Sequence, residues 1–265
     1  MARKPSFPVR LDGITPAQSG AAGAVARAAA VRERSLPAPG GLGLDSAAVR
    51  QRMVERLRTE GIGDERVLSA MATVERHRFV DSALVNQAYE DTSLPIGHGQ
   101  TISKPSVVAR MMEILLAAPA FRGAASAGDL PVLRVLEIGS GCGYQAAVLS
   151  QLVPEVYSIE RVRALHERAR QNLRALRLAN LHLLFGDGMP GYPGGAPYAG
   201  IVSAAGGRLL PDDWIAQLCV GGRIVAPTET PAGAQALLVV DRTAQGVERQ
   251  VLEAVHFVPL KSGVE

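Results

Sequence analysis

The segment VLRVLEIGSGCGYQAAVLS, residues 132–150, decides the fold. It joins an apolar run to three glycines in a GxGxG pattern, Gly139, Gly141 and Gly143, and a helical pattern begins at Tyr144. A strand that ends in a glycine-rich turn before a helix is typical of sheets that bind nucleotides, because glycine lets the backbone turn tightly and approach a ligand closely. The segment therefore predicts a nucleotide-type ligand. The alternative is that the glycines only make the turn.

Short apolar runs and amphipathic segments alternate along the chain after residue 132. The expected strands cover residues 132–139, 155–160, 181–187, 199–205 and 222–227, and the expected helices cover residues 144–152, 161–176 and 212–219. Such alternation predicts an α/β fold with a doubly wound, mostly parallel sheet and helices on both of its faces. Two further apolar runs, 235–243 and 251–260, have no helix between them. They are expected to complete the sheet as antiparallel strands.

Two acidic residues stand where predicted strands end. Glu160 ends the second strand, and a carboxylate at this place accepts hydrogen bonds from ribose hydroxyls in nucleotide-binding folds. The alternative for Glu160 is an exposed carboxylate at a helix start, stabilised by the helix dipole. Asp187 follows the third strand and is expected either to accept from an adenine amino group or to stabilise a plain turn.

The residues ahead of the sheet predict helices and one loop. Asp45 is expected to cap a first helix and Asp64 to start a second. Residues 88–103, AYEDTSLPIGHGQTIS, are interrupted by proline and glycine and are expected to form a loop. Ser103 is then expected to cap a helix that has Pro105 in its first turn.

Residues 1–44 differ in composition from the rest of the chain. They are rich in Ala, Gly, Pro and Ser, and they carry six basic and two acidic groups. Such a segment buries too little surface to offset its ordering entropy, so it is expected to be a disordered tail. Within it, residues 21–34 have the pattern of a short helix, and the acid-poor composition resembles an organelle transit peptide. Residues 117–131 are rich in Ala and Gly and are expected to form an irregular connection.

Composition excludes several classes of protein. The net charge of +3 comes from the tail, because the remaining 221 residues hold 22 basic and 23 acidic groups, so nucleic acid is not the expected partner. No apolar run reaches the roughly 18 residues of a membrane span. Cys142 and Cys219 make no disulfide framework, and the five histidines are scattered, so we expect a cytoplasmic protein without a metal site.

These features together resemble class I S-adenosylmethionine-dependent methyltransferases, and residues 45–260 more narrowly resemble the protein-L-isoaspartate O-methyltransferase family. The stretch most specific to that family is AYEDTSLPIGHGQTIS; VLEIGSGCGYQAAVLS, VYSIERV, GDG, QLCVGGRIVAP and HFVPL also match. The resemblance implies a Rossmann-like methyltransferase fold with an N-terminal helical segment. Residues 45–265 would form a single domain, with N-terminal helices and a substrate loop in 45–116 and the cofactor-binding sheet in 132–265.

The resemblance also implies an activity. Family members transfer the methyl group of S-adenosylmethionine to the free carboxylate of L-isoaspartyl residues, and more weakly of D-aspartyl residues, in damaged proteins and peptides. S-adenosylhomocysteine is the other product, and the methyl ester collapses through a succinimide that returns part of the chain to normal aspartate. The expected protein is a monomer that uses no metal and binds neither nucleic acid nor membrane.

The family's functional residues carry over onto matching positions. Ser103 corresponds to the active-site serine. The residues expected to contact S-adenosylmethionine are Thr101, Ile102, Ser103, Glu137, Gly139, Gly141, Gly143, Glu160, Asp187, Gly188 and Gln235. A carboxylate is already ionised at neutral pH, so this chemistry needs alignment and not a general base. The hydroxyl of Ser103 is expected to hold the acceptor carboxylate; the alternative is that it only caps the helix.

Two positions depart from the family pattern. Ala199 stands where the family usually carries Asp, and Glu229 ends a Pro-Thr-Glu segment that is usually Pro-Val-Gly. Both are expected at or near the active-site edge, which leaves open a protein that binds the cofactor but has altered chemistry or a different acceptor. A NAD-dependent oxidoreductase is a further alternative, and the early third glycine and the lack of a Tyr-x3-Lys pair argue against the short-chain class of these enzymes. The absence of an Asn/Asp-Pro-Pro-aromatic tetrapeptide argues against methylation of nucleic-acid bases.

Overall fold

The computed structural model describes residues 47–122, 133–230 and 233–265. All of them belong to one compact unit, residues 41–265. The expectations for the tail, for the cap at Asp45 and for most of the connection at 117–131 concern positions outside the described residues.

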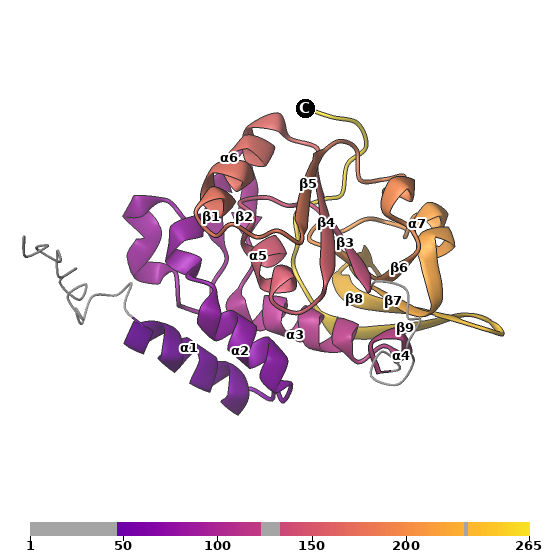
Figure 1. Cartoon of the computed structure of the whole chain (residues 1–265), viewed down its shortest axis with the longest axis horizontal. Helices are drawn as coiled ribbons and strands as arrows, with labels where there is room; N and C mark the ends of the chain where they lie inside the picture. The colour runs from indigo at the N-terminus through magenta and orange to yellow at the C-terminus, as the bar shows by residue number, and fades with distance from the viewer. Residues whose placement is uncertain (1–46, 123–132, 231–232) are drawn as a thin grey trace, which may run out of the picture. The chain divides into compact units, whose positions relative to one another are not determined.

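Seven strands form one sheet in the order β5-β4-β3-β6-β7-β8-β9 (Figure 1). The strands are β3 (Arg134–Ile138), β4 (Glu155–Glu160), β5 (Leu181–Phe185), β6 (Tyr198–Ser203), β7 (Leu218–Glu229), β8 (Gln235–Thr243) and β9 (Gly246–Ala254). Strands β3 to β7 are parallel, whereas β8 and β9 pair in antiparallel fashion. The predicted fold class is confirmed. The chain runs from β3 outward to β5 and returns to β6 on the other side of β3, so the topological switch point lies between β3 and β6.

The prediction for the last strand is wrong in its bounds. β9 begins at Gly246, well before the expected start at Val251, and residues 255–260 lie outside it. The early residues of β9 are polar because β9 is an exposed edge strand, so no apolar run marks them. The apolar residues 255–260 instead lead toward the carboxyl edge of the sheet, where Pro259 makes a parallel bridge with Gly206.

Helices cover the sheet and build the N-terminal part. They are α1 (Ala47–Thr59), α2 (Glu65–Thr73), α3 (Pro105–Leu116), α4 (Pro119–Arg122), α5 (Tyr144–Ser150), α6 (Arg163–Arg174) and α7 (Asp212–Gln217), with short 3-10 helices at Arg76–Phe79, Ser82–Gln87 and Pro193–Gly195. Asp64 caps α2 as predicted, accepting from the backbone N–H of Arg66 at 2.9 Å. The apolar face of α3 packs against β6 and β7, with Met112 and Leu115 fully buried.

The loop predicted for residues 88–103 contains a hairpin. Strands β1 (Leu94–Gly97) and β2 (Gln100–Ile102) pair in antiparallel fashion. His98 and Gly99 form the turn with φ values of 53° and 67°, and positive φ at both central residues is what a two-residue hairpin turn of type I′ requires. The proline and glycines hid this hairpin in the sequence, because they weaken a strand pattern.

Ser103 does not cap α3. The residue before the helix is Lys104, whose side chain makes no capping hydrogen bond, and Pro105 is the first helical residue as predicted. At this helix end, a residue of the preceding loop accepts the hydrogen bond of a free backbone N–H group instead. Asp91 accepts from the backbone N–H of Ser106 at 2.9 Å and from its hydroxyl at 2.8 Å. No hydrogen bond of the Ser103 hydroxyl is found among the described residues.

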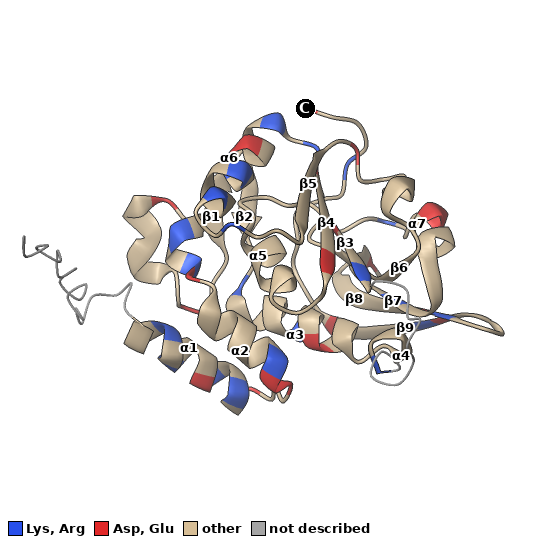
Figure 2. Cartoon of the chain, in the orientation of Figure 1, with Lys and Arg blue, Asp and Glu red and all other residues tan. Residues whose placement is uncertain are grey.

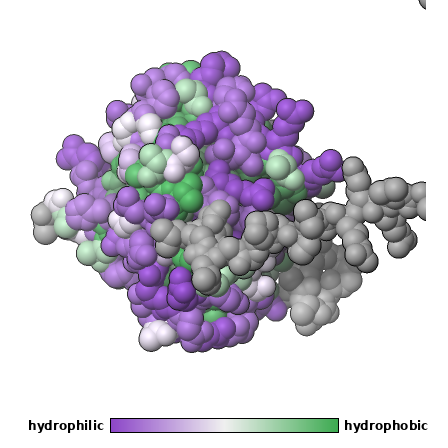
Figure 3. Space-filling view, turned by 90° about the vertical axis from the view of Figure 1, so that its left-hand side faces the viewer, coloured by the Kyte–Doolittle hydropathy of each residue, from purple (hydrophilic) through white to green (hydrophobic). Residues whose placement is uncertain are grey.

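The surface is mixed in character. Figure 2 shows acidic and basic residues interspersed along α1 and α6, in keeping with the balanced charge outside the tail. The face in Figure 3 is mostly polar, with an apolar area near its centre. Within residues 47–122, 133–230 and 233–265, no helix combines the length and the hydropathy needed to span a membrane.

Candidate active site

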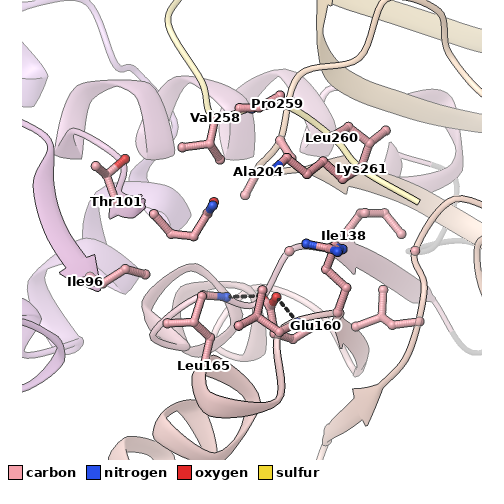
Figure 4. A pocket seen from close by; sticks show the side chains of 18 residues that line it. Ile96, Thr101, Ile138, Glu160, Leu165, Ala204, Val258, Pro259, Leu260 and Lys261 are labelled. Carbon is pink, nitrogen blue, oxygen red and sulfur yellow. Dashed lines mark hydrogen bonds between the residues drawn. The ribbon is translucent and has the colours of Figure 1, made fainter. Parts of the chain in front are cut away.

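A cavity lies at the carboxyl ends of β3, β4 and β6, where the switch point places ligands in sheets of this kind (Figure 4). Its walls come from the glycine turn after β3, the ends of β4 and β6, the β1–β2 hairpin and the C-terminal segment. The lining residues are Ile96, Gln100, Thr101, Ile138, Gly139, Gly141, Ile159, Glu160, Arg161, Val162, Leu165, Gly188, Ala204, Ala205, Val258, Pro259, Leu260 and Lys261.

A second, smaller cavity adjoins the first. The two share Gly139 and Gly141 of the glycine turn, together with Ile96, Thr101 and Ala204. The smaller cavity is lined in addition by Ile102, Ser103, Val108, Ser140, Cys142, Tyr144 and Gln145. The structure therefore brings the predicted Thr101, Ile102 and Ser103 to the glycine turn although they are distant from it in sequence.

The glycine turn is built as the sequence predicted, with one difference in role. Gly139, Gly141 and Gly143 all have positive φ, at 91°, 55° and 89°. Gly143 lines neither cavity. It stands at the start of α5, where a Cβ would lie 2.8 Å from the Leu173 side chain, so this glycine serves the turn and the packing of α6.

Glu160 lies in the cavity wall at the end of β4. Its side chain is buried, and its two oxygens accept from the backbone N–H groups of Gly141 at 2.8 Å and Val162 at 2.9 Å (Figure 4). These bonds fix the orientation of the carboxylate. Each oxygen keeps a further lone pair, so the group can accept from two hydroxyls of a ligand. The geometry fits the ribose-binding role expected for this residue.

Glu137 does not reach either cavity. It is fully buried beneath the glycine turn, where the Ser158 hydroxyl donates to its Oε2, and Ser158 shares a 2.6 Å hydrogen bond with the hydroxyl of Ser140. Burial raises the pKa of Glu137 to about 8. The side chain thus supports the turn from below, and the expectation of direct contact with the cofactor does not match its position.

Asp187 and Gln235 also lie behind the cavity wall. Asp187 accepts from the backbone N–H of Met189 at 2.8 Å and of Gly263 at 2.6 Å, while its neighbour Gly188 lines the cavity. The amide oxygen of Gln235 accepts from the N–H of Phe257 at 2.7 Å. Both side chains hold the C-terminal segment that forms part of the wall.

That C-terminal segment is the part of the site that sequence reasoning missed. Residues 258–261 line the cavity, and the chain on either side of them is fastened. Gly206 donates to the carbonyl of Val258 at 2.8 Å, and the Arg161 side chain donates to the carbonyl of Gly263 at 2.8 Å and pairs with Glu265 at 3.0 Å. The match of HFVPL to the family was the only signal in the sequence, and no local pattern placed it beside the glycine turn.

The segment that carries Ser103 is held by a buried arginine. Arg76 is fully buried; its Nε donates to the carbonyl of Ala88 at 2.8 Å, and its guanidinium lies 4.8 Å from the centre of the Tyr144 ring. Burial lowers the pKa of Arg76, and no acidic side chain within the described ranges forms an ion pair with it. Arg76 therefore ties the start of the 88–103 stretch to the start of α5.

The two departures from the family pattern lie away from the cavity lining. Ala199 is buried near the amino end of β6, so the expectation that it stands at the active-site edge is wrong, because ligands bind at the opposite end of parallel strands. Glu229 ends β7 at the carboxyl edge but lines neither cavity; its carboxylate lies 3.6 Å from Arg208. The chemical character of the cavity walls is independent of both substitutions.

The glutamate at the end of β4 gives a direct test of the cavity. Replacing Glu160 with alanine removes the acceptor for two ribose hydroxyls, so the dissociation constant for S-adenosylhomocysteine is expected to rise about 10- to 100-fold, for a loss of about 1–3 kcal/mol. Titration calorimetry of a folded variant measures it. Glu167→Ala, on α6 but outside both cavities, is the matched control. Equal affinities for the wild-type and the Glu160→Ala proteins would contradict the ribose-binding role.

The fold and the site define a class of protein. A doubly wound sheet whose glycine turn and strand-end carboxylate face one cavity is the arrangement of an S-adenosylmethionine-dependent methyltransferase of class I, and no cluster of metal-ligating side chains occurs among the residues described. Residues 48–265 match the family model described as protein-L-isoaspartate(D-aspartate) O-methyltransferase. The chain belongs to this family.

Comparisons with individual proteins support the assignment of the chain to this family. The chain is 56% identical to the protein-L-isoaspartate O-methyltransferase of Methylibium petroleiphilum, covering 98% of this chain and 97% of the relative, and 56% identical to that of Leptothrix cholodnii, covering 88% and 80%. A solved protein-L-isoaspartate O-methyltransferase superimposes with a TM-score of 0.70 and 27% identity, covering 81% of this chain and 67% of that one. A Plasmodium falciparum structure in complex with S-adenosyl-L-homocysteine, 23% identical, shares the fold with a TM-score of 0.66, covering 80% and 98%.

Proposed function

We propose that the protein transfers the methyl group of S-adenosylmethionine to the free carboxylate of L-isoaspartyl residues, and more weakly of D-aspartyl residues, in damaged proteins and peptides. The observation that carries this proposal is the pair of adjoining cavities. One has the Glu160 carboxylate in its wall, the other has Ser103, and the glycine turn borders both.

The residues of the larger cavity fit the methyl donor. Glu160 offers lone pairs to the ribose, the ends of β3 and β4 supply the apolar side chains of Ile138 and Ile159, and Gly188 leaves room beside them. A Cβ at Gly188 would lie 2.6 Å from the Ile138 side chain, so this wall tolerates glycine alone without movement. Bound here, S-adenosylmethionine supplies a methyl group on a positively charged sulfur that a carboxylate oxygen can attack.

The chain's own contribution is alignment and exclusion of water. The acceptor carboxylate is ionised at neutral pH, so no side chain has to remove a proton. Among the residues that the structure describes, the Ser103 hydroxyl has no hydrogen-bond partner, so it can donate to one carboxylate oxygen and leave the other aimed at the methyl group. The hairpin and residues 258–261 both form part of the cavity wall, and a ligand that they enclose is shielded from water. Positioning of this kind contributes up to about 7–11 kcal/mol in intramolecular models.

We propose in addition that the protein works in the cytoplasm as a monomer, without a nucleic-acid partner, and that residues 1–44 are dispensable for turnover. The balanced charge of residues 45–265 supports the exclusion of nucleic acid. Free Cys142 and Cys219 are in keeping with a reducing compartment. The position of the tail outside residues 48–265, the range that matches the family model, supports its dispensability.

The activity is tested with two versions of one peptide that differ only in carrying an isoaspartyl or a normal aspartyl residue. The protein is expected to form a methyl ester on the isoaspartyl peptide, to form S-adenosylhomocysteine in equal amount, and to leave the aspartyl peptide unchanged. Mass spectrometry at slightly acidic pH, which preserves the ester, follows both products. Methylation of both peptides alike, or of neither by a protein that binds S-adenosylhomocysteine, would overturn the proposal.

A further inference from the structure

The β1–β2 hairpin is a wall of both cavities, and its position depends on what holds it from outside. Ile96 and Thr101 of the hairpin line both cavities (Figure 4). The two strands pair with each other and form a sheet of their own. A two-stranded hairpin is only marginally stable by itself in water, so contacts with the rest of the protein must keep this wall in place.

One side chain supplies the directional part of that attachment. Nη1 of Arg168, on α6, donates to the carbonyl oxygen of Ile96 at 2.8 Å. Within the part of the chain that is described, this is the only hydrogen bond that joins residues 94–102 to residues outside the hairpin. Leu94, Ile96 and Ile102 also pack in the core, but apolar packing has no preferred direction. The hydrogen bond from Arg168 therefore fixes where the hairpin lies.

The carbonyl that Arg168 binds belongs to an irregular position of the hairpin. The register of β1 against β2 shifts between Pro95 and Gly97, so Ile96 is left without a partner residue in β2, as in a bulge. The side chain of Ile96 also reaches the glycine turn, because a Cβ on Gly141 would lie only 3.1 Å from its Cδ1 atom. The position of Ile96 therefore sets the gap between the hairpin and the glycine turn.

The same helix holds the glycine turn. Asn172 follows Arg168 by four positions and so lies on the same face of α6. Its Nδ2 donates to the carbonyl oxygen of Cys142 at 2.9 Å, and Cys142 belongs to the glycine turn and lines the smaller cavity. One face of α6 thus binds two walls of the site, the hairpin through Arg168 and the glycine turn through Asn172.

We infer that Arg168 is a positioning residue for methyl transfer, which acts by holding the β1–β2 hairpin in place over the two cavities. The inference rests on the proposed function and adds to it a residue that lines neither cavity. Ser103 directly follows β2, so a hairpin that shifts also shifts the hydroxyl proposed to hold the acceptor carboxylate. A misplacement of about 1 Å can lower the rate of a reaction about 100-fold.

Arg168→Met tests the inference, because methionine keeps an unbranched apolar side chain and removes the donor. With saturating S-adenosylmethionine, kcat for an isoaspartyl peptide is expected to fall about tenfold or more. Hydrogen exchange at the backbone amides of residues 94–102 is expected to become about tenfold or more faster, because losing a hydrogen bond from a charged donor favours the detached hairpin. Amides of β3 and β4 should exchange as in wild type. Arg168→Lys keeps a cationic donor, so both quantities should lie between those of wild type and Arg168→Met, and it replaces a methionine variant that does not fold.

Arg170→Met is the matched control. Arg170 lies on the same helix, pairs with Glu167 at 3.3 Å and lines neither cavity, so its loss removes the same charge without affecting the hairpin. This variant is expected to keep the wild-type kcat and the wild-type exchange of residues 94–102. An equal effect of Arg170→Met and Arg168→Met would trace the change to charge and would contradict the inference.

Three further results would overturn it. Wild-type exchange of residues 94–102 in Arg168→Met would show that apolar packing alone holds the hairpin. Equally fast exchange in β3 and β4, with a lower melting temperature, would give Arg168 a general structural role. Faster exchange of the hairpin with an unchanged kcat would separate its position from the chemical step. Failure of the proposed function is distinct, because it would appear in the wild-type protein as the absence of peptide methylation, whereas the exchange of the hairpin can be measured without that activity.

Discussion

Replacing Ser103 with alanine is expected to lower the rate of methyl transfer to an isoaspartyl peptide about 100- to 1,000-fold, the usual effect of losing a preorganised donor at the reacting group. The melting temperature should hardly change. Ser103 does not cap α3, and no hydrogen bond of its hydroxyl is found within the part of the chain that the structure describes, so its loss should cost less than about 0.5 kcal/mol of unfolding free energy. Steady-state kinetics with saturating S-adenosylmethionine, measured beside thermal unfolding, separates the two quantities.

Ser106 is the matched control for Ser103. Its hydroxyl donates to Asp91 at 2.8 Å, so Ser106→Ala loses a bond that fastens the loop to α3, at a cost of about 1 kcal/mol. The two variants should therefore have opposite profiles, with Ser103→Ala stable but slow and Ser106→Ala less stable but faster. Full activity of a Ser103→Gly protein at saturating donor would show that the hydroxyl has no part in the chemical step.

Stability should fall as the pH rises toward 8, because of the buried Glu137. Burial raises its pKa from 4.5 to about 8. Between these values the folded protein holds a proton that the unfolded chain releases, so this stabilisation is complete below about pH 4.5 and is lost as the pH passes through the folded-state pKa. The expected slope is about 1.4 kcal/mol per pH unit, and the total over this window is up to about 5 kcal/mol.

Urea unfolding of wild type and of Glu137→Gln at about pH 5 and about pH 8 measures the effect. The amide cannot ionise, so the variant should lose most of the difference between the two pH values while still accepting from Ser158. Glu248→Gln, on exposed β9, should keep the wild-type dependence. A Glu137→Gln protein with the same pH dependence as wild type would show that Glu137 is ionised in the fold.

Much of the fold could be predicted because the apolar runs of a buried parallel sheet are continuous and easy to recognise. β4 and β8 occupy the expected residues, and the helix that starts after Asp64 has the expected cap. The predictions failed for segments whose local sequence pattern does not reflect their position in the folded protein. β9 is an edge strand with polar residues, and the β1–β2 hairpin contains Pro95, Gly97 and Gly99, which resemble a loop in the sequence.

The same distinction separates the site residues that could be predicted from those that could not. Residues that follow strands or belong to the glycine turn, such as Gly141, Glu160 and Gly188, line the cavity as predicted, because the carboxyl edge of a parallel sheet gathers them. Neither the burial of Glu137 nor the contact of Asp187 with the C-terminal segment could be predicted, since both depend on what packs against these side chains.

The C-terminal wall makes ligand affinity a measure of complete folding. Residues 258–261 close a cavity whose floor is formed by the turn after β3, more than a hundred positions earlier in the chain, and Asp187 and Arg161 fasten the segment beyond them. A chain whose last residues are undocked has the sheet but not the full cavity. Because a ligand that binds only the docked state draws the population toward it, donor and product should protect the amides of this segment from hydrogen exchange in proportion to their occupancy.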